Sequence, residues 1–177
     1  RRHGIKPFDV PDSGSLFEVL GAELDVIDIV QERGCELIYD LNKPLPLWRT
    51  QPYDFVLDVG TLEHCFNIGQ AAFNMAGLVK VGGLIMHENP FNWGNHGFYG
   101  LNPTWYHDFY EANGFEIVEC LLIKSGTFEG ATPPPHKRFV YTHDEVNLVA
   151  IAKRNEIVSF QYPTQSKYRK ADAGNRA

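Results

Sequence analysis

Short apolar runs separated by polar residues are the dominant pattern along this chain. Runs of this length, bounded by Gly, Pro, Asn or Asp, are typical of strands buried in a sheet. Most of them end in a carboxylate, an amide or a histidine. Strands are therefore predicted at Leu24 to Ile29, Glu36 to Tyr39, Phe55 to Leu57, Leu84 to His87, Phe115 to Ile123 and Val146 to Ala152.

Three other segments carry the spacing of a helix. The clearest is Ile68 to Lys80, whose apolar residues recur on one helical face before Gly82-Gly83 ends the pattern. Thr104 to Ala112 starts beside a proline and stops at Asn113-Gly114. Ser13 to Leu20 can form a short helix with either Asp12 or Ser13 as its N-cap. These elements predict an α/β domain.

The order of the elements predicts a Rossmann-like, doubly wound and mostly parallel sheet, with an antiparallel strand at one edge because no helix separates the last two strands. A single domain is expected over residues 1–162, followed by a poorly ordered tail over 163–177. The long segment between the last two strands, Lys124 to Asp144, is expected to be a functional or mobile loop.

Composition narrows the function classes. The formal charge of −6 disfavours nucleic acid as a partner, since phosphate contacts need clustered Lys and Arg. The sequence has no apolar run long enough for a membrane span, and no secretion leader is recognised. Cys35, Cys65 and Cys120 form no Cys-x-x-Cys pair, and Cys35 and Cys120 are expected to be buried thiols. A cytoplasmic protein is expected, of undetermined oligomeric state.

Carboxylates close three successive predicted strands, at Asp28, Asp40 and Asp58. In a doubly wound sheet such residues line one crevice, where an acid hydrogen-bonds ribose hydroxyls and a second acid can accept from an adenine amino group. Carboxylates repel phosphate, so a nucleoside without phosphates is favoured over a dinucleotide. Taken singly, each aspartate is also explained as a turn former or helix cap.

The stretch Tyr53 to His64, with its Asp-Val-Gly-Thr-Leu-Glu-His loop, and the downstream Gly82-Gly83 carry a family resemblance. The sequence resembles class I S-adenosylmethionine-dependent methyltransferases over about Leu16 to Ile151. The resemblance implies S-adenosylmethionine as cofactor. The cofactor-binding residues that it implies are Asp28 and Ile29 for the ribose, Asp40 and Leu41 for the adenine edge, and Asp58, Val59 and Gly60 beneath the methionine moiety.

The chain departs from this family at its start, because it contains no Gly-x-Gly turn. Either the first strand lies upstream of Arg1, or a divergent loop near Pro11 to Ser15 replaces it. This departure motivates a second hypothesis from another class, a non-catalytic binding or assembly module. A nicotinamide-dependent oxidoreductase is disfavoured because no phosphate-cradling turn is present.

A polar loop follows the strand that ends at His87. His87 and His96 are candidate bases that could accept a proton from an acceptor hydroxyl, because the ordinary pKa of histidine lies near neutral pH. The acceptor is expected to be a small molecule or a sugar. Its candidate contacts are His64, Asn89, Asn92, Trp93 and Tyr99. Two alternatives remain. In the first, these side chains stabilise turns. In the second, Glu63, His64, His87 and His96 bind a metal, but the spacing of a zinc motif is missing, and a site without metal is favoured.

Overall fold

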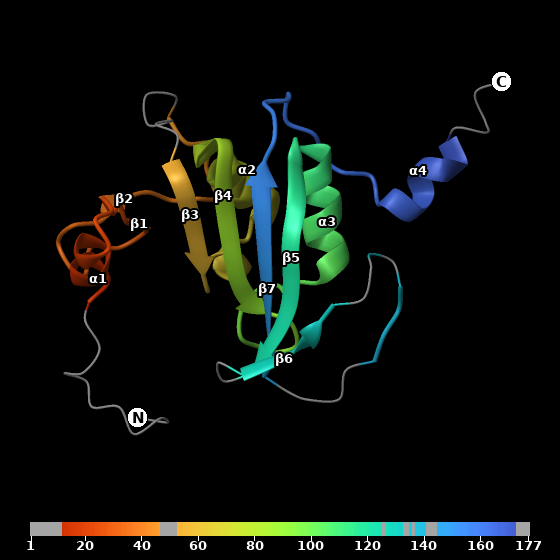
Figure 1. Cartoon of the computed structure of the whole chain (residues 1–177), viewed down its shortest axis with the longest axis horizontal. Helices are drawn as coiled ribbons and strands as arrows, with labels where there is room; N and C mark the ends of the chain where they lie inside the picture. The colour runs from red at the N-terminus through yellow and green to blue at the C-terminus, as the bar shows by residue number, and fades with distance from the viewer. Residues whose placement is uncertain are drawn as a thin grey trace. The chain divides into compact units, whose positions relative to one another are not determined.

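The computed structural model describes residues 12–46, 53–124, 127–132, 135, 137–140 and 145–172. It divides the chain into two units, Arg1–Asp40 and Leu41–Ala177, and each is considered by itself (Figure 1). The first unit contains helix α1 (Ser13–Val19) and two short parallel strands, β1 (Ile27–Asp28) and β2 (Leu37–Ile38). Asp12 caps α1 as expected, because its Oδ1 accepts a hydrogen bond from Ser15 N at 3.0 Å.

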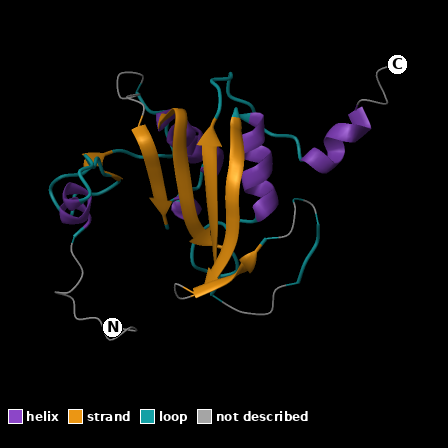
Figure 2. Cartoon of the chain, viewed as in Figure 1, coloured by secondary structure: helices purple, strands orange, loops and turns teal. Residues whose placement is uncertain are grey.

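The second unit is built on a five-stranded sheet (Figure 2). Its strands are β3 (Tyr53–Val59), β4 (Val79–Pro90), β5 (Phe115–Lys124), β6 (Thr127–Ala131) and β7 (Asn147–Arg154), in the spatial order β3-β4-β7-β5-β6. Only β3 and β4 pair in parallel, joined by the 3-10 turn η2 (Leu62–His64) and helix α2 (Ile68–Leu78). The other three pairings are antiparallel.

The prediction of a doubly wound, mostly parallel sheet is therefore wrong. The chain turns back after β5, and β7 enters the sheet between β4 and β5 instead of at an edge, so antiparallel pairing dominates. A doubly wound sheet also needs helices on both faces. Here α2 and α3 (Pro103–Ala112) both lie behind the sheet in the view of Figure 1.

The helix-covered face of the sheet holds the core. Side chains on β3 alternate: Asp58 is buried on that face, whereas Phe55, Leu57 and Val59 are exposed on the other. The core itself is made mainly of aliphatic and aromatic residues from η2, α2, β4, α3, β5 and β7. The polar residues at the ends of β3 and β4 thus point into a helix-covered interior and must find partners there.

Several element boundaries differ from the expected ones. β4 starts at Val79, before Gly82-Gly83, so the helix stop lies earlier than the glycines indicate. β6 forms a hairpin with β5 inside the segment expected to be a loop, part of which lies outside the described residues. Helix α4 (Ser166–Asp172) occurs where no element was expected, and Asp108 on α3 holds it through Ser166 and through Arg169 at 3.0 Å. A divergent loop near Pro11 to Ser15 was one of two explanations for the missing glycine turn. In the structure, Ser13 to Ser15 form the start of α1, and Pro11 lies outside the described residues.

The cysteines separate into two groups. Cys65 and Cys120 are buried, whereas Cys35 is exposed, contrary to expectation. Burial raises the pKa of the Cys120 thiol, which disfavours its reactive thiolate form. In the part of the chain that the structure describes, no helix combines the length and apolar character needed to cross a membrane.

Candidate functional site

Asp58 is the organising residue at the end of β3. The loop after the strand folds back over it, so that Oδ1 accepts hydrogen bonds from the backbone N–H groups of Thr61 and Leu62, each at 3.1 Å. Oδ2 accepts from His87 Nδ1 at 2.6 Å and from Asn89 Nδ2 at 3.0 Å. Four donors fill the acceptor capacity of a carboxylate. The Asp58 side chain therefore holds the loop in place and has no capacity left for a ligand.

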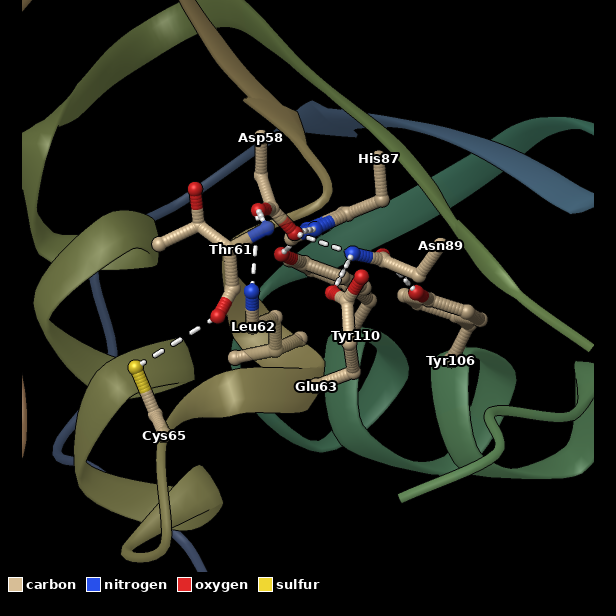
Figure 3. Close-up of polar contacts among 9 residues, drawn as sticks. All are labelled: Asp58, Thr61, Leu62, Glu63, Cys65, His87, Asn89, Tyr106 and Tyr110. Atoms are coloured by element: carbon tan, nitrogen blue, oxygen red, sulfur yellow. Dashed lines mark hydrogen bonds and ion pairs between the residues drawn. The ribbon is translucent and has the colours of Figure 1, made fainter. Parts of the chain in front are cut away.

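His87 lies between Asp58 and α3 (Figure 3). It is the register partner of Asp58 across the parallel β3-β4 pair, which explains why the two side chains meet. Its Nε2 lies 2.5 Å from the hydroxyl of Tyr110, and the ring is fully buried. If Nδ1 donates to Asp58, then Nε2 of a neutral imidazole accepts from Tyr110, and every bond has one donor and one acceptor. This geometry leaves neither ring nitrogen open to a substrate and disfavours the expected role of His87 as a base.

Asn89 joins two buried carboxylates. Its Nδ2 donates to Asp58 Oδ2 and, at 2.9 Å, to Glu63 Oε2, while its Oδ1 accepts from Tyr106 (Figure 3). The amide is fully buried and its interactions use both hydrogens. Asn89 is thus a structural link between the exit loop of β3 and helix α3, and the geometry does not favour the expected substrate contact.

Burial raises the pKa of both Tyr106 and Tyr110 well above the ordinary value, and the negative charge of Asp58 adds to the shift. The two phenols therefore remain neutral donors. Since the folded-state pKa is raised, their contribution to stability is fully present below the unfolded-state pKa of about 10 and is lost as pH rises above it.

We expect the free energy of unfolding to fall as pH rises above about 10, the ordinary pKa of tyrosine. Urea unfolding across alkaline pH measures this slope, and phenolate absorbance of the folded chain should show two phenols that stay protonated. Tyr110→Phe should make the slope shallower, because one of the shifted groups is then absent. If stability depended on pH equally in Tyr110→Phe and in the unaltered chain, Tyr110 would not have a raised pKa in the folded state.

A second group of side chains lies on the open side of the same loop. His64 and His96 are exposed by 49% and 39%, and each places Nε2 near Oε1 of Glu63, at 3.7 and 3.6 Å. The loop that carries His96 docks on the exit of β3 through a hydrogen bond from Phe98 N to Glu63 O at 2.9 Å. The loops after the two parallel strands therefore meet, as expected at the carboxyl ends of such strands.

Some of the remaining predicted site residues stabilise the loop after β4, and others are exposed to solvent. Asn92 accepts from Val146 N at 2.9 Å, and Tyr99 donates to Phe66 O at 2.8 Å, so both help to fix the loop after β4. Trp93 packs edge-on against His96, with ring centroids 5.1 Å apart. Val59, the last residue of β3, and Gly60, which follows it, are both exposed.

The adenosine side of the predicted cofactor site falls mostly in the first unit. There Asp28 accepts from Val30 N at 3.2 Å, Ile29 is exposed, and Asp40 is the last residue. Leu41 belongs to the second unit, where its carbonyl accepts from Asn74 Nδ2 at 3.0 Å. The roles of Asp28, Ile29, Asp40 and Leu41 stay predictions.

Tyr106 and Tyr110 are the members of the site that sequence reasoning missed. They are expected to be core residues, and they are buried, but their hydroxyls also complete the polar network. Their spacing of i and i+4 on α3 places both phenols on one face, which was the available signal. No protein-family model matches this chain, and no curated protein matches it either.

Proposed function

We propose that this chain is an S-adenosylmethionine-dependent methyltransferase acting on a small-molecule or sugar hydroxyl. The observation that carries the proposal is the loop after β3, which hydrogen bonds to Asp58 hold in a fixed conformation. Asp58 fixes the loop after β3 from inside. Val59 at the end of β3 and Gly60 at the start of this loop are exposed at the carboxyl end of a parallel strand pair, where ligands bind in α/β proteins. The resemblance of Tyr53 to His64 to methyltransferases supports the choice of cofactor.

Gly60 suits contact with a ligand through its backbone. Its φ of +76° is a conformation that glycine adopts without strain, and without a side chain its backbone can be approached closely. The amide N–H of Gly60 donates to Glu88 O at 3.0 Å, which anchors this position to β4. We therefore assign Val59 and Gly60 to the floor under the cofactor.

The cofactor supplies a methyl group bonded to a positively charged sulfur. When bound above Val59 and Gly60, it would supply this methyl group to the acceptor oxygen, and the electron pair of the broken carbon–sulfur bond would stay on sulfur. The acceptor hydroxyl would lose its proton, and we propose His96 as the base that accepts it, because its ring is exposed. Alignment of the acceptor is the larger contribution to rate.

The network also agrees with a second candidate function, a binding module without catalysis. The buried polar side chains of the site, Asp58, His87 and Asn89, are bonded to one another, so they stabilise the fold whether or not a reaction takes place. Such a module would bind a ligand at the same loops without methyl transfer.

Calorimetric titration of the chain with S-adenosylhomocysteine tests the proposal. We expect binding in the submillimolar range, and at least about tenfold weaker binding, or about 1.4 kcal/mol, for Val59→Glu, which places bulk and charge on the floor. Val118→Glu is the matched control, since both valines are exposed on strands, by 60% and 55%. Absence of binding heat for the unaltered chain would contradict the proposal. Binding without methyl transfer to any hydroxyl acceptor would favour the module.

A further inference from the structure

We propose that Glu63, His64 and His96 form a binding site for a divalent transition-metal ion such as Zn²⁺. The three residues bring two imidazole nitrogens and one carboxylate oxygen together, and these ligand atoms all lie within 4.8 Å of one another. His64 and Glu63 come from the 3-10 turn after β3, and His96 comes from the loop after β4. The proposal does not depend on methyl transfer.

The carboxylate of Glu63 is the observation that points to a ligand. Its side chain is fully buried, and Oε1 has no hydrogen-bond partner among the described residues. The two histidine nitrogens face this oxygen at 3.7 and 3.6 Å, which is too long for a hydrogen bond. A buried carboxylate oxygen without a partner is costly, and a cation between the three atoms would satisfy it.

The two distances from Glu63 to the histidines suit a small ion after slight adjustment, and the two histidine nitrogens, within 4.8 Å of each other, would move closer together. Ligand bonds of about 2.0–2.2 Å in a tetrahedral zinc site place the ligand atoms about 3.3–3.6 Å apart. Both Glu63 distances are within a few tenths of an ångström of that range. Because His64 and His96 are half-exposed, their rings have room to turn toward the ion.

The supporting contacts hold Glu63 in place as a one-oxygen ligand. Asn89 donates to Oε2 at 2.9 Å, which leaves Oε1 facing the histidines. Gly97 packs so closely on Glu63 that an added Cβ would lie 2.9 Å from Glu63 Cγ and from Glu63 O. Carboxylate ligands fixed by such contacts bind metals more tightly than free ones.

The donor set selects the kind of ion. Two nitrogens and one oxygen suit Zn²⁺, Co²⁺, Ni²⁺ or Cu²⁺, whereas Ca²⁺ and Mg²⁺ prefer six or more oxygens. Three protein ligands leave a fourth position for water or a substrate oxygen, as in catalytic zinc sites. A metal on His96 Nε2 would occupy the lone pair that a base needs. The metal-bound and the base roles of His96 therefore exclude each other, and a metal would itself promote loss of the acceptor proton.

The test is a zinc titration of the chain, free of any polyhistidine tag, in competition with a chromophoric chelator. We expect one Zn²⁺ per chain, and His64→Ala and His96→Ala should each weaken binding by at least about tenfold. His107→Ala is the matched control, because His107 also lies near a carboxylate, with Nδ1 3.8 Å from Glu111 Oε1, but outside the cluster. Co²⁺ added to the unaltered chain should give visible ligand-field absorption that Zn²⁺ removes. Absence of zinc binding, zinc affinity unchanged in both histidine variants, or no Co²⁺ spectrum would overturn the proposal.

Discussion

Asp58→Ala should lower the free energy of unfolding by at least about 3 kcal/mol, because each buried donor that loses its acceptor costs about 1–3 kcal/mol. The variant leaves four donors without an acceptor: the N–H groups of Thr61 and Leu62, the Nδ1 of His87 and the Nδ2 of Asn89. The hydrogen bonds from Leu62, His87 and Asn89 are buried, so water cannot replace the lost carboxylate there. Urea unfolding followed by circular dichroism measures the change.

Asp54→Ala on the same strand is the control. Asp54 is an exposed aspartate that pairs with Lys80, and its removal should change stability by less than about 0.5 kcal/mol. If Asp58→Ala does not fold, the stability of Asp58→Asn is measured instead. Its amide oxygen can still accept from the loop, but its N–H₂ would face other donors, so its stability should lie between those of the alanine variant and the unaltered chain. Equal stability of the Asp58 and Asp54 variants would refute the structural role of Asp58.

Gly97→Ala should destabilise the chain by about 1–3 kcal/mol, because an added methyl in a packed contact must displace its neighbours. At Gly97 those neighbours are Cγ and the backbone carbonyl of Glu63, each 2.9 Å from the added carbon. The backbone part of this contact is not free to turn away. The loop after β4 would shift from the exit of β3, and His96 would move away from Glu63.

Gly94→Ala in the same loop separates this effect from any general cost of replacing glycine there. An added carbon at Gly94 meets no atom within 4 Å. The control should therefore unfold within about 0.5 kcal/mol of the unaltered chain. Thermal unfolding of both variants measures the difference, and a Gly97 variant as stable as the Gly94 variant would show that the two loops do not pack as described.

Local signals in the sequence were sufficient for most elements of this fold, and the global arrangement was not. Pro103 and Asn113-Gly114 bound α3 almost to the residue, since caps and stops act within one turn of chain. The strand patterns at β3, β5 and β7 are likewise local. The place of β7 between β4 and β5 is decided by contacts between distant segments, which periodicity does not encode, so the prediction of a parallel doubly wound sheet was wrong.

In the candidate site, too, the sequence predicted local features but not those that depend on distant segments. The polar residues at the ends of β3 and β4 were expected to meet, and Asp58, His87 and Asn89 do meet. Their orientation depends on which face of the sheet the helices cover, which the sequence pattern left undetermined. Because α3 covers the face to which these side chains point, they are buried by Tyr106 and Tyr110. The accessible chemistry belongs instead to His64 and His96.

We infer that the inner residues at the end of β3 support the fold, while the outer surface at Val59 and Gly60 receives the cofactor. A crystal structure of the chain grown with S-adenosylhomocysteine is the test. We predict ligand density against Val59 and Gly60, with the hydrogen bonds of Asp58 to His87 and Asn89 retained. Density that contacts the side chains of Asp58 or His87, or the absence of ligand at Gly60 under saturating conditions, would contradict the account.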